Sequence, residues 1–178
     1  MKITRIRGAV APIPSPMRNA VISFDRMTIS VVAVETDVIR AGKPVVGYGF
    51  CSNGRYAQSG IFRDRLVPRV METAPDDLLD ASGENLSPQK VSRAMMRDEK
   101  PGGHGDRAVA VAAIDMAVWD AVAKIAGQPL WRVLADRYNP GAPLGELLVY
   151  SGGGYYYPDD EKQGLIDEMQ RTRDLGYR

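Results

Sequence analysis

Cysteine and histidine are almost absent from this sequence, since Cys51 and His104 are the only residues of their kinds among 178. A single cysteine excludes an internal disulfide framework and fits a reducing compartment. A single histidine, with no cysteine or clustered carboxylates at metal-binding spacing, gives no zinc signature, so we interpret His104 as a residue that orders its loop. The sequence therefore predicts neither a disulfide-stabilised secreted domain nor a metal site of its own.

The sequence also lacks an excess of one charge sign, because it contains 23 basic and 22 acidic residues. A nearly neutral chain without a basic cluster argues against nucleic acid and against an anionic membrane surface as partners. No run of about 20 apolar residues could span a bilayer, and charges interrupt residues 1–7. With 44% hydrophobic residues the chain can bury a core, so we expect a globular cytoplasmic protein.

The first third of the chain has the pattern of an antiparallel meander. Strands are predicted at Lys2–Val10, Arg26–Asp37 and Val45–Phe50, which alternate polar with apolar residues or are rich in β-branched ones. Prolines at 12, 14 and 16 force an extended loop after the first strand. Arg40–Lys43 has the composition of the turn that joins the second and third strands.

Helical patterns follow these strands. We expect one helix over Gly60–Met71, which Pro68 would kink or shorten, and another over Pro88–Arg97 with Ser87 as its N-cap. Three strands followed by helices indicate an α+β fold.

The longest predicted helix covers Arg107–Ala126, with Asp106 as its N-cap and Gly127 as its left-handed end. When the residues of this helix are placed at about 100° each around its axis, they divide into two faces. The face expected to be wetter contains Asp106, Ala113, Ala117, Asp120 and Lys124. Asp115 falls on the opposite, apolar face and must be hydrogen-bonded or paired there. The many alanines indicate that neighbouring elements approach the helix closely.

Near residue 139 the composition of the sequence changes. Asn139–Pro143 is rich in helix breakers, Glu146–Tyr150 is a predicted strand, and Asp159–Leu175 is a predicted helix. One strand and one helix do not make a domain, and they have the order of the first β/α unit of a TIM-type barrel. We therefore predict an α+β domain over residues 1–139 and the start of a barrel over 140–178, with further strands expected after it.

Several polar residues could bind an anion. Lys100 lies in a glycine-rich loop that can bring an ammonium group and backbone N–H donors to a ligand. Arg18 and Asn19 follow the proline segment, and Asn53 and Arg55 follow the third strand, so two loops present amide and guanidinium donors that suit carboxylates and hydroxyls. Each of these residues could instead be an ordinary surface or turn residue.

Tyr155, Tyr156 and Tyr157 follow the predicted barrel strand, which is the catalytic end of such barrels. Either one hydroxyl faces the pocket, with Tyr156 as our choice, or the three rings form an aromatic plug.

The segment Ala110–Lys124, followed by Gly127–Leu130, resembles the helix motif of the mandelate racemase and muconate lactonizing branch of the enolase superfamily. Further segments together resemble the D-tartrate dehydratases of that branch: Ser15–Ala20, Gly47–Arg55, Glu99–Gly105 and Gly152–Pro158. The resemblance covers essentially the whole chain. It implies an α+β capping domain (a three-stranded antiparallel meander followed by helices) fused to the first β/α unit of an incomplete TIM-type barrel.

The resemblance also implies a function, the Mg²⁺-dependent dehydration of a small hydroxy-diacid such as tartrate, in an enzyme that forms homo-oligomers. Asn19, Asn53 and Lys100 become substrate contacts, with Arg18, Arg55 and Tyr156 beside them. The Mg²⁺ ligands and catalytic bases of the family have no counterpart here and are expected beyond Arg178, so we expect this chain alone to be inactive. The alternatives are another acid-sugar dehydratase or racemase of the same branch, or a non-catalytic α+β interaction module.

Overall fold

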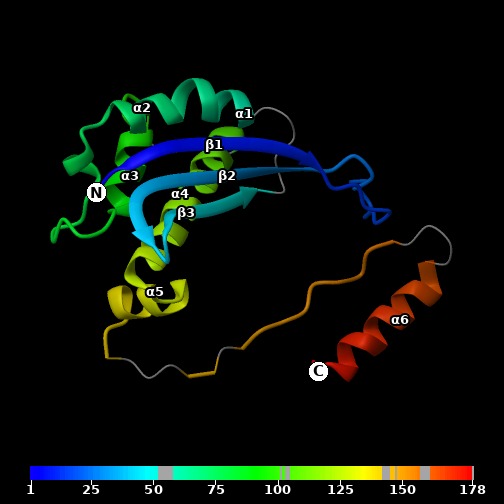
Figure 1. Cartoon of the computed structure of the whole chain (residues 1–178). Helices are drawn as coiled ribbons and strands as arrows, with labels where there is room; N and C mark the ends of the chain where they lie inside the picture. The colour runs from blue at the N-terminus through cyan, green and yellow to red at the C-terminus, as the bar shows by residue number, and fades with distance from the viewer. Residues whose placement is uncertain are drawn as a thin grey trace. The chain divides into compact units, whose positions relative to one another are not determined.

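The structure is a computed structural model that describes residues 1–51, 58–100, 102, 105–141, 145–146, 148–156 and 161–177 (Figure 1). It divides into two compact units. The first contains Met1–Ala11 and Thr28–Ala142, and the second contains Pro12–Met27 and Pro143–Arg178. The loop after the first strand thus groups with the C-terminal segment, which a single boundary at residue 139 does not anticipate. The assignment of residues 1–139 and 140–178 to a cap and a barrel stays a prediction.

The first unit is built on the predicted antiparallel meander. Its strands are β1 (Ile3–Pro12), β2 (Thr28–Arg40) and β3 (Lys43–Cys51), in the order β1-β2-β3. Ala41 and Gly42 have φ angles of 48° and 75°, and Arg40 pairs with Lys43, so a two-residue turn with both φ angles positive joins β2 to β3. The predicted three-stranded sheet is confirmed.

Helices cover one face of this sheet. Val32, Val34 and Val45 are buried beneath them, whereas Tyr48 and Phe50 on the alternate positions of β3 are exposed. This period of two is the pattern of a sheet with one face in the core.

The predicted helix over Gly60–Met71 is a continuous helical stretch of three parts, α1 (Gln58–Ile61), a single π-helical segment η1 (Phe62–Leu66) and α2 (Val67–Glu72). Pro68 stands just after the π segment. Proline has no N–H and its ring would press on the carbonyl of Asp64 four residues before, so widening the preceding turn relieves the clash without ending the helix.

Two short helices lead to the centre of the unit. They are the 3₁₀ turn η2 (Pro75–Leu78) and α3 (Pro88–Met95). The side chain of Ser87 accepts a hydrogen bond from the backbone N–H of Lys90, which confirms Ser87 as the N-cap of α3.

The long central helix is α4 (Asp106–Ala126), and Gly127 ends it with a left-handed φ of 67° as predicted. The N-cap prediction is wrong by one residue. Gly105, with a φ of 81°, occupies the cap position, and Asp106 is already the first helical residue. A carboxylate in the first turn still interacts favourably with the helix dipole.

The face of α4 that we expected to be wet is the one that packs on the sheet. Ala113, Ala117 and Ala121 are buried on it, and a β-carbon added to Gly47 or Gly49 of β3 would collide with backbone atoms of α4. The expected close approach at the alanines is therefore confirmed, but the assignment of that face to solvent is wrong. Helix and strand backbones can touch because neither side has more than a methyl group.

Asp120 and Lys124 belong to this interface too. The Asp120 carboxylate accepts a hydrogen bond of 2.8 Å from the backbone N–H of Tyr48, and the Lys124 ammonium donates one of 2.9 Å to the carbonyl of Val46. The two side chains form an ion pair of 2.5 Å. Since β3 is an edge strand, this pair occupies backbone groups that would otherwise be open to another strand.

Helix α5 (Leu130–Tyr138) was not predicted. Its signal was Pro129, which precedes the first helical residue with a φ of −66°. On this helix the Arg137 guanidinium lies 5.4 Å from the ring centroid of Trp119.

The second unit contains α6 (Glu161–Asp174), which confirms the predicted C-terminal helix. The strand predicted at Glu146–Tyr150 is wrong for the described residues of that range, which belong to no ladder. A strand gains its hydrogen bonds from neighbours, and no described residue pairs with this segment. Val149, Ile166 and Met169 are exposed, which agrees with a barrel unit that has no further strands and helices to pack against, and Leu147 lies outside the described residues.

The glycines of β3 give a direct test of the helix contact. Gly49→Ala should lower the free energy of unfolding by about 1–3 kcal/mol, because the new methyl group overlaps backbone that cannot rotate away. Gly60→Ala in α1 is the matched control. A β-carbon there meets nothing within 4 Å, so its stability should match or exceed wild type. Urea denaturation of both variants measures the difference, and equal stabilities would contradict the close packing.

Candidate functional site

The loop Pro12–Met27, which carries Arg18 and Asn19, is closed by its own backbone. The N–H of Ile13 donates to Met27, the N–H of Ser15 to Phe24, and the N–H of Phe24 to Met17, at 2.8, 2.9 and 3.1 Å. The proline-rich segment is therefore a loop as predicted, with the two sides held together across it.

Asn19 shapes the tip of this loop. Its Oδ1 accepts hydrogen bonds from the backbone N–H groups of Val21 and Ile22, at 2.9 and 2.7 Å. The turn-forming role that we held open is therefore real. Because Oδ1 faces the backbone, the amide nitrogen is the half of the exposed side chain that remains for a ligand.

Tyr156 lies beside Arg18. Their backbones form an antiparallel bridge, with hydrogen bonds of 2.8 and 3.3 Å, and the guanidinium carbon of Arg18 is 5.8 Å from the centroid of the Tyr156 ring. Tyr155 instead makes an edge-to-face contact of 5.8 Å with Phe24. Tyr155 thus acts as an aromatic contact, whereas Tyr156 stays 41% exposed next to a cation.

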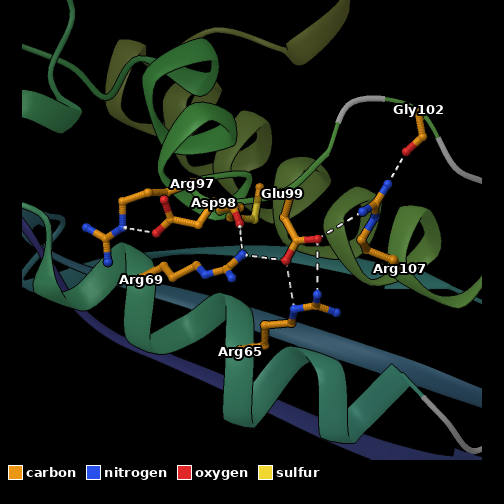
Figure 2. Close-up of polar contacts among 8 residues, drawn as sticks. Arg65, Arg69, Arg97, Asp98, Glu99, Gly102 and Arg107 are labelled. Atoms are coloured by element: carbon orange, nitrogen blue, oxygen red, sulfur yellow. Dashed lines mark hydrogen bonds and ion pairs between the residues drawn. The ribbon is translucent and has the colours of Figure 1, made fainter.

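In the first unit, the loop that carries Lys100 begins at Glu99, whose carboxylate is buried (Figure 2). The side chain of Glu99 is only 4% exposed and receives three guanidinium groups. Arg65 of η1, Arg69 of α2 and Arg107 of α4 approach its oxygens at 2.7, 2.8 and 2.9 Å. We refer to these four residues as the Glu99 cluster.

The Glu99 cluster fixes the start of the loop. Arg69 also donates to the carbonyl of Met95 at the end of α3, and Arg107 donates to the carbonyl of Gly102. Hydrogen bonds from Arg69, with those from Arg107, hold the pKa of Glu99 below its usual range. The carboxylate is therefore charged at neutral pH and ties three helical segments to the loop.

Lys100 comes directly after this anchor and is exposed. Its ammonium group has no hydrogen-bond or ion-pair partner in the part of the chain that the structure describes. Three guanidinium groups against one carboxylate leave the adjacent Glu99 cluster with an excess of positive charge. An anion near Lys100 would meet a favourable potential.

Of the six residues proposed as substrate contacts, the structure brings together Arg18, Asn19 and Tyr156, all in the second unit. Lys100 belongs to the first unit. Asn53 and Arg55 lie outside the described residues.

The Glu99 cluster was missed by the sequence analysis. One local signal was present, because Arg65 and Arg69 stand four residues apart on a predicted helix and so share one of its faces. Their acidic partner is 34 and 30 residues away along the chain, at a distance that no periodicity reports.

Asp115 is hydrogen-bonded, as its position on the apolar face of α4 requires. It is half-buried, and burial raises the pKa of its carboxyl group, while a hydrogen bond from the Trp119 side chain partly offsets that rise. Trp119 is the neighbour one helical turn along. We assign Asp115 a structural role.

The described residues contain no group of three or more His, Cys, Asp or Glu side chains that could hold a metal ion. Among those same residues, no helix is both long and apolar enough to cross a bilayer.

Comparison with known proteins identifies the family. Residues 2–135 match the mandelate racemase / muconate lactonizing enzyme N-terminal domain. The chain belongs to this family. Its three-stranded antiparallel sheet and following helices are the capping domain of the enolase superfamily.

Individual relatives agree with this assignment. A D-mannonate dehydratase from Xanthomonas oryzae pv. oryzicola (strain BLS256) is 38% identical over 68 residues, which are 38% of this chain and 14% of that protein. A solved enolase from Bradyrhizobium, complexed with magnesium and mandelic acid, is 26% identical with a TM-score of 0.54, over 75% of this chain and 34% of that one.

A solved mandelate racemase/muconate lactonizing enzyme from Roseovarius nubinhibens ISM, complexed with magnesium, covers 100% of this chain at 24% identity and a TM-score of 0.60. The chain covers 43% of it. The capping-domain chain thus spans less than half the length of each of these three relatives.

The Glu99 cluster predicts a pH-dependent stability. Because the folded pKa of Glu99 lies below its unfolded value of about 4.3, the stabilisation is present above that value and is lost as pH falls through the folded pKa. Glu99→Gln should lower the Tm by several degrees at pH 7, and the gap to wild type should narrow below about pH 4.

Asp64→Asn is the control for this experiment. Asp64 also pairs with an arginine, Arg63 at 2.6 Å, but both side chains are exposed, and such pairs contribute little. Scanning calorimetry from pH 3 to pH 7 should show a pH-dependent loss for Glu99→Gln only. A constant gap would mean that the carboxylate charge does not stabilise the fold.

Proposed function

We propose that this chain is the substrate-selecting, N-terminal part of an acid-sugar dehydratase that acts on tartrate. The observation that carries the proposal is the loop Pro12–Met27, where Arg18 and the free amide nitrogen of Asn19 stand together beside Tyr156. Family membership and the dehydratase among the relatives support the reaction class.

These side chains suit a small hydroxy-diacid. A guanidinium group binds a carboxylate through two parallel hydrogen bonds, and an amide N–H₂ or a phenol binds a hydroxyl oxygen. In the first unit, the Lys100 ammonium is the candidate partner for a substrate carboxylate. Lys100 suits this role because its neighbour Glu99 is held by three arginines, so the loop is fixed at its root while the ammonium group stays exposed.

The proposed reaction is removal of the proton α to one carboxylate, followed by loss of the β-hydroxyl group as water. The resulting enol tautomerises to oxaloacetate, and the proton balance requires a base and an acid. We assign neither to the described residues. Those residues do not fit a Mg²⁺ site either, so no step in this chain is attributed to the metal. We propose that the complete enzyme uses Mg²⁺, as the solved relatives complexed with magnesium suggest.

A second candidate is the dehydration of a longer acid sugar. It is favoured by one observation, the 38% identity with a D-mannonate dehydratase over 68 residues. The two candidates differ in the charge of the substrate. Mannonate has one carboxylate and tartrate two, so tartrate offers more anionic groups to the basic side chains proposed as contacts.

Lys100→Ala tests the proposed contact with tartrate in the full-length enzyme. For tartrate we expect kcat/KM to fall about 10- to 10²-fold, because a charge-assisted hydrogen bond of roughly 1.5–3 kcal/mol is lost. The Tm should stay within about 1 °C, since Lys100 is exposed and unpaired among the described residues. Lys90→Ala, on the exposed side of α3, is the matched control and should leave both values unchanged. A Tm loss that accounts for the lost activity would contradict a role in binding.

Asn19→Asp tests the other contact without removing the turn. The carboxylate can still accept the N–H groups of Val21 and Ile22, but it has no amide donor and would repel an anionic substrate. We expect KM for tartrate to rise about tenfold with little change in Tm. Asn19→Ala should add a loss of stability, because two backbone N–H groups lose their acceptor. An unchanged KM in Asn19→Asp would show that Asn19 does not contact the substrate.

A further inference from the structure

A cavity of about 180 Å³ lies in the first unit, and no residue of the Glu99 cluster lines it. It is partly open to solvent and is lined by β1, β2, the α1–η1 segment and α4, with mostly apolar residues that include Ile6, Val32, Phe62 and Ala113. The space is well above the roughly 10–15 Å³ that admits one water, and below the ~300 Å³ at which sites for drug-sized ligands begin. Its size fits a small organic molecule.

One buried polar side chain in this lining has no hydrogen-bond partner among the described residues. Gln58, at the start of α1, is 3% exposed, and neither its Oε1 nor its Nε2 has a hydrogen-bond partner among the described residues. Buried amides are nearly always paired, so a group left unpaired in a cavity wall points to a molecule that occupies the cavity. An acceptor and a donor side by side are complementary to a group that offers a donor and an acceptor in the same arrangement.

The charges around the cavity select against ions. Arg63 is the one charged residue in the described lining, and its guanidinium is bound to the carboxylate of Asp64 by two hydrogen bonds of 2.6 and 2.7 Å. No unpaired charge therefore faces the cavity from its described walls. A carboxylate ligand would enter an apolar space without a counter-ion, which is unfavourable.

We propose that this cavity is a binding site for a small uncharged molecule that carries a primary amide, held by two hydrogen bonds to Gln58 with its hydrocarbon part against Phe62 and Ala113. The proposed ligand differs from tartrate in chemical class, because this apolar lining disfavours a diacid through its charge. It adds a second ligand class to the capping domain.

Propionamide is a suitable probe, since it joins a primary amide to a short alkyl chain. In a heteronuclear NMR titration of the purified chain, propionamide should cause saturable shifts, with intermolecular NOEs from its methyl group to the ring of Phe62 and the methyl of Ala113. Propionate, which is charged, and N,N-dimethylpropionamide, which has no N–H donor, should bind at least tenfold more weakly. These comparisons need no variant and so do not depend on a mutant that folds.

Gln58→Leu then tests the residue itself. It should weaken propionamide binding at least tenfold, while its Tm equals or exceeds that of wild type, because a buried unpaired amide has been replaced by an apolar group. Gln128→Leu, at an exposed glutamine outside the cavity, should change the affinity less than twofold. The proposal is overturned if wild type shows no saturable shift, as expected when the cavity holds only water, or if Gln58→Leu binds the probe unchanged.

Discussion

The fold of the capping domain depends on one close contact, between the backbone of α4 and that of β3. Gly47 and Gly49 leave the strand without side chains where Ala113, Ala117 and Ala121 leave the helix with only methyl groups. The dispersion energy of such a contact is large because many atoms meet at short range, and it disappears if either surface gains volume. The contact therefore fixes both the distance and the axial position of α4 on the sheet.

The position of α4 in turn organises the Glu99 cluster. Arg107 stands in the first turn of α4, and it can reach Glu99 and Gly102 only because the helix begins where it does. Arg65 and Arg69 reach the same carboxylate from η1 and α2, and the π segment before Pro68 keeps those two helical parts continuous. Packing in the core thus determines where the exposed Lys100 loop begins. The position of the proposed substrate contact therefore depends on apolar residues of the core.

Asp115 and Asp120 illustrate why the faces of α4 were assigned in part incorrectly. Both are acids on a helix rich in alanine, and periodicity alone ranks Asp120, beside Lys124, as the solvent-facing one. In the fold, Asp120 and Lys124 bind backbone groups of β3, so only their assignment to solvent is wrong. Asp115 is half-buried next to Trp119, in agreement with its predicted place on the apolar face. Hydrophobic periodicity cannot distinguish water from an edge strand, since both offer hydrogen-bond partners to a charged side chain.

The sequence by itself determined the strands of the sheet, the long helix with its end at Gly127, the cap at Ser87 and the family motif around Asp115. These features depend on the backbone preferences of neighbouring residues, which the sequence lists in order. Only the tertiary structure decided which face of α4 meets the sheet, that Pro12–Met27 groups with the C-terminal segment, and that Glu99 is bound by three arginines. Each of these features is a contact between residues that are distant in sequence. Such contacts depend on how shape and charge fit together in three dimensions. The strand expected at Glu146–Tyr150 belongs to the same class, because a strand exists only through the hydrogen bonds that another segment supplies.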